Sequence, residues 1–117
     1  MKESEFECPI TNKIYVIKVG ETAQDNWDII DDADGSDIWF HVDKFPSCHV
    51  ILKSDSMTLK KIHKSVIRHC AGLCKEGSKQ KNAKNVSIIY TEIRNVTCNK
   101  KGAVGSVFTR NTQNIKI

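Results

Sequence analysis

The sequence contains no run of about 18 or more apolar residues, so it predicts no membrane-spanning helix. Its first ten residues, MKESEFECPI, lack the apolar segment of a secretion signal. It also lacks the motifs of a P-loop, a dinucleotide-binding loop, an HExxH metalloprotease and a nucleophile elbow. These absences argue against the commonest enzyme classes. We therefore expect a cytoplasmic, non-enzymatic protein with no membrane partner and no cofactor.

Cysteine pairs are missing too. The five cysteines are an odd number, and no two of them form a CxxC pair: Cys8, Cys48, Cys70, Cys74 and Cys98. Without a secretion signal, a framework of disulfides is not expected. His69 lies beside Cys70 and five residues before Cys74, but a zinc site normally has two such ligand clusters. We expect structural thiols and no metal site.

Charge is unevenly distributed along the 117 residues, of which 27% are charged and 39% hydrophobic. This length is enough for a single domain, residues 1–117, with one modest core. Residues 1–43 carry eleven acidic and three basic side chains, whereas residues 44–117 carry three acidic and fifteen basic ones. The net charge of +4 thus divides into −8 and +12. This division favours a polyanion-binding surface in the second part, or mutual neutralisation of the two parts in the fold.

Hydrophobic periodicity predicts an α+β domain, with a mainly antiparallel sheet, one long amphipathic helix and one short helix. β-branched and aromatic residues predict strands at 6–10, 14–19, 86–91, 93–96, 105–108 and 115–117. The short helix is expected at 21–30, with Thr22 as a possible N-cap. The long helix is expected at about 58–76, with cap candidates among residues 54–56 and Gly77 as its C-terminal stop.

The predicted long helix has two distinct faces. Its apolar stripe consists of Leu59, Ile62, Val66, Cys70, Leu73 and Cys74, at spacings of three and four residues. The opposing side gathers Lys60, Lys61, Lys64, Arg68 and Lys75. A polar loop follows, and it adds Lys79, Lys81 and Lys84. Such a helix face and loop would hold phosphates, or would serve only for solubility.

Residues 37–52 predict two strands joined by a short connection that contains Pro46. Because strand side chains alternate, Asp37, Trp39 and His41 would share one face, with an apolar row behind them. If the hairpin is centred on Phe45, His41 and His49 face each other across the strand pair. The alternative is that these side chains are ordinary packing residues.

Several motifs resemble the RNA-binding module found at the C-terminal end of NFACT proteins, which are ribosome-quality-control factors. The similarity extends to the core of eukaryotic coiled-coil-domain-containing proteins. The segment DIWFH, followed by PSCHVIL, resembles the family's DIWFH…P-x-x-HV-I/V-L pattern. VGETAQDN resembles VGRNA…QN, with Glu21 where the family usually has arginine. If that arginine contacts phosphate in relatives, the contact is lost or reversed here.

Two further segments extend the resemblance over roughly residues 20–117. AGLCKEGSK resembles A-x-L-A-x-x-x-S-K, so Ser78 and Lys79 match the family's serine and lysine. The family's V-x-V-x-Y-T-x-V-x-N-V and K-x-x-G…G-x-V-x-Y patterns are matched through Val86, Tyr90, Thr91, Asn95, Val96, Gly102, Gly105 and Val107. Val104 stands where the family commonly has proline.

The resemblance implies a module that binds tRNA or ribosomal RNA in translation or ribosome-associated quality control. The expected RNA-binding residues are Trp39, His41, His49, Lys60, Lys64, Arg68, Lys75, Ser78, Lys79, Lys81, Lys84, Lys100 and Lys101. The lysines and Arg68 would form one continuous cradle for phosphates, and the aromatic rings would shape a pocket or stack a base. DNA binding, a protein-interaction role on ribosomes, and a nuclease that uses His41 and His49 near Asp37 are the alternatives.

Overall fold

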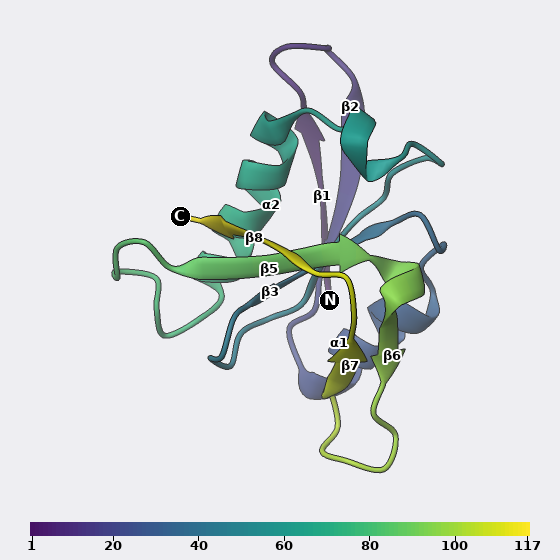
Figure 1. Cartoon of the computed structure of the whole chain (residues 1–117), viewed down its shortest axis with the longest axis vertical. Helices are drawn as coiled ribbons and strands as arrows, with labels where there is room; N and C mark the ends of the chain where they lie inside the picture. Colours follow the sequence, from purple (N-terminus) through teal and green to yellow (C-terminus); the bar gives the residue numbers. More distant parts are fainter.

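Large alternating apolar side chains place β3 (Ile38–Val42) at the centre of an antiparallel sheet of six strands. The computed structural model describes all residues from 1 to 117 (Figure 1). The order in the large sheet is β1 (Lys2–Glu7), β2 (Ile14–Val19), β4 (Val50–Leu52), β3, β5 (Ser87–Glu92) and β8 (Gln113–Lys116). A smaller sheet pairs β6 (Val96–Cys98) with β7 (Val107–Thr109).

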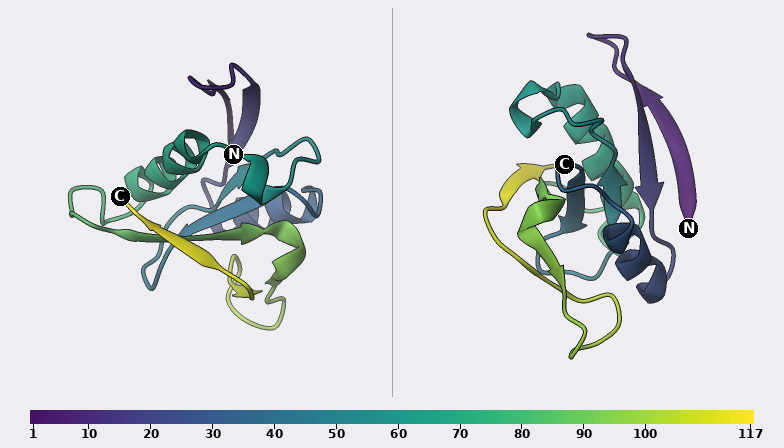
Figure 2. Two further views of the ribbon diagram at one scale, coloured as in Figure 1. Left: turned by 45° about the horizontal axis from the view of Figure 1, so that its top comes forward. Right: turned by 90° about the vertical axis from the view of Figure 1, so that its right-hand side faces the viewer.

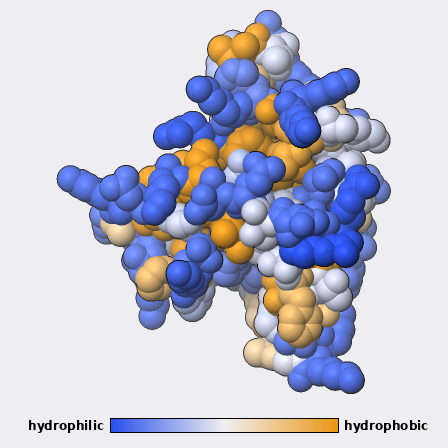
Figure 3. Space-filling view, viewed as in Figure 1, coloured by the Kyte–Doolittle hydropathy of each residue, from blue (hydrophilic) through white to orange (hydrophobic).

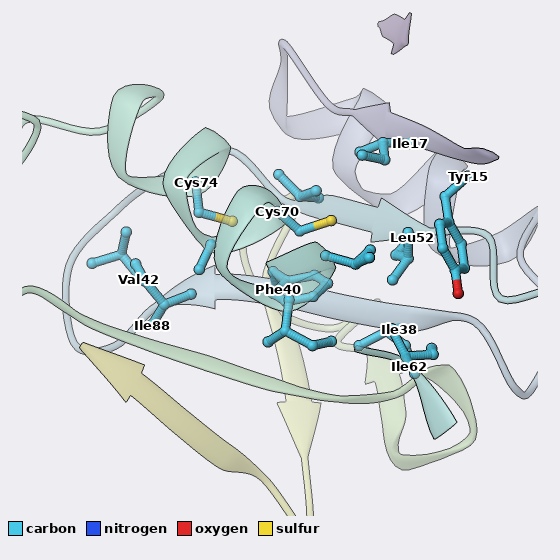
Figure 4. Packing of buried hydrophobic residues seen from close by; sticks show 14 of the residues in the cluster. Tyr15, Ile17, Ile38, Phe40, Val42, Leu52, Ile62, Cys70, Cys74 and Ile88 are labelled. Atoms are coloured by element: carbon cyan, nitrogen blue, oxygen red, sulfur yellow. The ribbon is translucent and has the colours of Figure 1, made fainter. Parts of the chain in front are cut away.

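Both faces of the central strands β4 and β3 are covered. Helix α2 (Lys64–Glu76) packs on one face, where its Cys70 and Cys74 meet Phe40 and neighbouring apolar side chains (Figure 4). On the other face, a smaller cluster joins Trp39 to α1 (Ala23–Asp31) and to the β6–β7 hairpin. Figure 2 shows α2 and the β6–β7 hairpin on opposite sides of the sheet. The central strands are therefore buried from both sides.

The predicted hairpin register is confirmed. Ile38 pairs with Leu52 and Phe40 pairs with Val50, which is the pairing of a hairpin centred on Phe45. The predicted alternation is also correct, because Ile38, Phe40 and Val42 belong to the α2 cluster whereas Trp39 belongs to the α1 cluster. The connection is longer than expected, since β4 begins at Val50 rather than at residue 48.

The long helix predicted at 58–76 is divided in the structure. A short 3-10 helix, η1 (Leu59–Lys61), precedes α2, and Ile62 and His63 between them have extended backbone angles. The imidazole Nδ1 of His63 accepts a hydrogen bond from the Ser65 amide, so His63 is the N-cap of α2. Ile62 remains buried in the core. The apolar stripe thus survives although the helix that was expected to carry it is broken.

Among the remaining elements, the predicted short helix agrees with the structure, whereas the strands expected at 6–10 and 93–96 are displaced. Thr22 is the N-cap of α1, and its side chain accepts a hydrogen bond from the Asp25 amide. After β5, a 3-10 turn, η2 (Ile93–Asn95), redirects the chain into β6. The first strand begins at Lys2, earlier than the residue 6 expected from the sequence. No helix has the length and apolar character needed to cross a membrane.

Candidate nucleic-acid interface

The two histidines of residues 37–52 meet where the β3–β4 register places them. The ring centroids of His41 and His49 lie 4.7 Å apart in an edge-to-face arrangement. The Trp39 indole Nε1 donates a hydrogen bond of 3.1 Å to Nδ1 of His49. The Trp39 ring also stacks on the ring of His41. Trp39 is 1% exposed and His49 3% exposed, whereas His41 is half-buried. The predicted cluster is present, but it lies largely inside the protein.

Burial decides the chemistry of this cluster. Desolvation, with the neighbouring His41 adding to the effect, lowers the pKa of His49 to about 3. Burial also lowers the pKa of His41. Neither imidazole is a cation at neutral pH, and the rings of Trp39 and His49 have no free face. Of the two roles predicted for these side chains, this burial favours shaping the adjacent surface over stacking a base.

Asp37 does not join the histidines. Its carboxylate accepts hydrogen bonds from the Lys53 ammonium group and from the backbone amides of Ser54 and Asp34. These contacts fix the chain where it leaves β4. No hydrogen bond links Asp37 to His41 or His49, so the acid–imidazole pairing on which the nuclease alternative depends is not formed.

The backbone of His49 connects the central strands to the start of α1. The His49 amide donates to Oδ1 of Asn26 at 3.2 Å, and its carbonyl accepts from the Gly20 amide at 3.0 Å. A Cβ atom on Gly20 would lie 2.1 Å from Oδ1 of Asn26, so only glycine permits this approach. The VGETAQDN segment is thereby anchored beside the β3–β4 connection.

A second junction joins that connection to the end of α2. The Cys48 amide donates to the carbonyl of Gly77, and Ser47 forms an isolated bridge with Ser78. The Ser78 hydroxyl donates to the carbonyl of Lys75 and accepts from the Gln80 amide. Ser78, which was predicted to bind RNA, therefore also has a structural role in turning the chain after α2.

Two cavities lie next to these junctions. The first, of about 1000 Å³, lies between the start of α1, the β3–β4 connection and the end of α2. The second, of about 490 Å³, lies between the same connection, residues 80–87 and β8. Phe45 and Gln80 line both cavities, so the cavities adjoin. We call the two cavities and the residues that line them the rim surface.

The two cavities differ in charge. Lys2 and Lys79 line the first cavity, but so do two acids, Glu21 and Glu76. The second cavity is lined by three lysines and one acid: Lys44, Lys84, Lys116 and Asp43. None of these lysines forms an ion pair in the structure. The second cavity therefore carries the stronger attraction for phosphate.

The lysines of the predicted cradle lie on separate elements of the fold. Lys79, Lys81 and Lys84 lie in the loop at the left extremity of Figure 1, which presents hydrophilic side chains in Figure 3. Lys100 and Lys101 lie at the tip of the β6–β7 hairpin, at the bottom of the same view. Lys100 is moreover engaged, since its ammonium group lies 3.4 Å from the Asp31 carboxylate and 4.3 Å from the Trp27 ring centroid.

The helix cations occupy a third region. Lys64 and Arg68 are exposed on α2, and Lys60 is exposed on η1 before the helix break. Lys75 is half-buried and donates a hydrogen bond to the backbone carbonyl of Ile117. Of the nine cations expected to bind RNA, only Lys100 pairs with a carboxylate. The acidic residues of 1–43 therefore neutralise only one of these nine cations from residues 44–117.

Most residues of the rim surface were not among the predicted site residues, and Lys44, Phe45, Gln80 and Lys116 are examples. Phe45 is 50% exposed, which is unusual for phenylalanine, and it follows Lys44 in the connection. The sequence signal that could have identified these two residues is a lysine followed by an aromatic residue in a predicted loop. Lys116 joins the site only because β8 pairs with β5.

The predicted thiols and the candidate metal ligands are placed as follows. All five cysteines are free, and Cys70 and Cys74 are buried in the α2 cluster. The His69 ring instead stacks on Phe6 of β1. No group of three or more histidine, cysteine, aspartate or glutamate side chains is arranged to hold a metal ion.

Comparison with known proteins identifies the family that the sequence motifs indicate. The family model described as "NFACT protein RNA binding domain" matches residues 5–116. Coiled-coil domain-containing protein 25 from Mus musculus is 33% identical over 110 residues, which are 92% of this chain and 53% of that protein. The homolog from Dictyostelium discoideum is 30% identical over 105 residues, covering 87% of this chain and 50% of that protein.

A solved structure supports the fold. The C-terminal part of the fibronectin/fibrinogen-binding protein from Streptococcus suis matches with a TM-score of 0.83 at 20% identity. The match covers 100% of this chain and 45% of that one. At this identity the likeness establishes the fold alone. The chain spans about half the length of the curated relatives that it matches.

Proposed function

Since this chain belongs to the NFACT protein RNA binding domain family, we propose that it binds RNA and that the rim surface is where it does so. One observation carries the choice of surface. The turn at 43–48, the loop at 77–85 and the end of β8 bring Lys44, Lys84 and Lys116 around one cavity, without carboxylate partners. Unpaired ammonium groups close together release counterions when they meet a phosphate backbone, which is the main source of affinity for nucleic acids.

The local geometry favours contact with a polyanion. The loop lysines Lys79, Lys81 and Lys84 are all exposed. The loop is held in place by Ser78 and by the backbone bond between Cys48 and Gly77, so its lysines project from an anchored segment. Anchoring lowers the entropy that is lost when the loop binds its partner.

The finer proposal names the RNA and its setting. We propose tRNA or ribosomal RNA as the partner, in the cytoplasm, in translation or ribosome-associated quality control. The support is the family resemblance, together with a surface of clustered lysines. DNA is the competing partner, because contacts to phosphate do not distinguish the two sugars. Competition between matched RNA and DNA oligonucleotides measures the preference directly.

The test is a titration of labelled tRNA at two salt concentrations. We expect the affinity to fall steeply with salt, and the triple variant Lys79→Ala, Lys81→Ala, Lys84→Ala to lose about tenfold or more at low salt while the salt slope becomes shallower by about 2. The matched control changes Lys60, Lys61 and Lys64 to alanine, since these exposed lysines lie before and at the start of α2. Equal losses in both triples would contradict the choice of the rim surface.

We propose binding without catalysis. Nδ1 of His49 is occupied by the Trp39 indole, and the pKa of His49 is about 3, so this imidazole is poorly suited to accept a proton at neutral pH. RNA incubated with the protein should remain intact. Cleavage that disappears in His41→Ala would instead establish the nuclease alternative. Co-purification with ribosomes in the absence of any RNA affinity would favour the protein-interaction role.

A further inference from the structure

The first cavity of the rim surface has a different chemistry from the second. Its four charged side chains are two lysines and two glutamates, so they balance. The Met1 amine adds a positive charge nearby, but it lies 2.8 Å from both the Glu21 and the Asp25 carboxylate. A phosphate placed in this cavity would face two glutamates and gain little. The cavity therefore suits an uncharged group.

Two side-chain amides also line the first cavity. Oδ1 of Asn26 accepts the hydrogen bond from the His49 amide, which fixes the orientation of the Asn26 side chain. Its amide nitrogen makes no hydrogen bond within the chain, and neither does the side-chain amide of Gln80. Asn26 therefore offers its amide donor, and Gln80 offers a donor and an acceptor side by side, which match the polar edges of nucleobases.

Phe45 stands between the two cavities. Its side chain is 50% exposed and lines both of them, with Lys44 and Lys84 on the side of the second cavity. An exposed aromatic ring beside lysines can stack an unpaired base while the lysines hold the adjoining phosphates. The bases of an A-form duplex are stacked within the helix and cannot reach such a ring.

We infer that the first cavity receives an unpaired nucleobase, so that the RNA recognised by this chain carries a single-stranded segment across Phe45. This inference rests on the proposed RNA binding and specifies its substrate class. The strand's phosphates lie along Lys44, Lys84 and Lys116, and its bases meet Phe45, Gln80 and Asn26. The cavity volume of about 1000 Å³ lies at the upper end of the range for ligand pockets.

The experiment compares two labelled RNA probes of about 12 nucleotides, a length within the span of common single-strand sites: an unstructured single strand and a blunt duplex of the same sequence. We expect the single strand to bind more tightly. Phe45→Ala should weaken single-strand binding by about 5- to 100-fold and leave the duplex unchanged, which is the range of one base–aromatic stack. Gln80→Ala should weaken single-strand binding to a smaller extent.

Matched variants separate stacking from other effects. Phe108→Ala removes a phenylalanine that is 62% exposed on the β6–β7 hairpin, away from both cavities, and should leave both affinities unchanged. Phe45→Tyr keeps an aromatic face and should retain binding, whereas Phe45→Leu should not. Because Phe45 is exposed, none of its variants should lower the unfolding midpoint, and that measurement accompanies each titration.

The outcomes distinguish this inference from the proposed function. If neither probe binds, RNA binding itself fails. If both probes bind equally, or the duplex binds better, and Phe45→Ala changes neither affinity, RNA binding stands and the single-strand inference is overturned. Loss of binding in Phe45→Leu and Phe45→Ala, with retention in Phe45→Tyr, supports a stacked base.

Discussion

The centre of the sheet and the rim surface use polar side chains for different purposes. At the centre, Asp37, Trp39 and His49 are almost fully buried and are hydrogen-bonded inside the chain. On the rim surface, Lys44 and Lys84 are exposed and have no carboxylate partner. The most distinctive stretch of the sequence thus supports the fold, while the loops next to it form the surface proposed for binding. Variants in the two regions should therefore affect different measurements.

The largest expected effect is at the centre. Asp37→Ala removes the acceptor of two backbone amides and the nearer carboxylate partner of Lys53, which keeps Asp34 at 3.7 Å, and it should lower the free energy of unfolding by about 3 kcal/mol. Denaturant unfolding measures the loss. The control is Asp31→Ala, which removes an exposed ion pair with Lys100 and should cost less than about 0.5 kcal/mol. Similar losses of stability in the two variants would contradict the structural role of Asp37.

The second effect is a pH dependence of stability. Because burial lowers the pKa of His49 to about 3 in the folded state, the unfolded chain, with an ordinary pKa near 6.5, binds the proton first. The free energy of unfolding should then fall as the pH drops from about 6.5 toward 3, by up to about 1.4 kcal/mol per pH unit. His41, whose pKa is also lowered, adds to the slope.

One variant tests whether His49 causes this pH dependence of stability. His49→Asn places an amide oxygen near the position of Nδ1, where it can still accept the Trp39 hydrogen bond, but it binds no proton in this pH range. Denaturant unfolding at several pH values should show a shallower dependence than in the unmodified chain. An unchanged slope would mean that other groups control acid stability.

The third effect concerns the rim surface alone. Lys44→Asn together with Lys116→Ala should weaken RNA binding about fivefold and change the free energy of unfolding by less than about 0.5 kcal/mol. Asparagine is chosen because Lys44 has a φ of 67°, a backbone conformation that asparagine tolerates well. Titration and denaturant unfolding of the same variant measure both quantities. A large loss of stability would show that the rim residues are structural.

The smallest effect is expected at the β6–β7 hairpin tip. Lys100 is already engaged by Asp31 and Trp27, and Lys101 follows it at the hairpin tip; neither lysine lines either cavity. Changing both to alanine should alter RNA affinity by less than about twofold. A loss as large as that of the triple variant in the 77–85 loop would restore the hairpin tip to the binding surface.

The helix break illustrates what sequence patterns cannot supply. Residues 58–76 contain neither proline nor a glycine near the break, and the apolar spacing continues through it. At the break, His63 caps α2 with its imidazole, an interaction that propensities do not describe. By contrast, the N-cap at Thr22 was predictable, since threonine before a helical pattern is a common cap.

The candidate site was predictable in its charges and not in its shape. The lysines of the 77–85 loop stand out in the sequence because they cluster without acids. Lys44, Phe45 and Lys116 did not, because they become neighbours only through the pairing of β8 with β5 and through the junction of Cys48 with Gly77. The burial of Trp39 was also open, because strand alternation does not reveal whether a second layer covers the face.

The sequence by itself determined the α+β class, the alternation of side chains along β3, the short helix and the basic character of the second part. Each of these follows from local periodicity or from composition, which neighbouring residues express without reference to the rest of the chain. Only the tertiary structure decided which aromatic ring is exposed, which lysines are free and which loops meet. Those properties depend on contacts between segments far apart in the chain, and such contacts leave no local pattern.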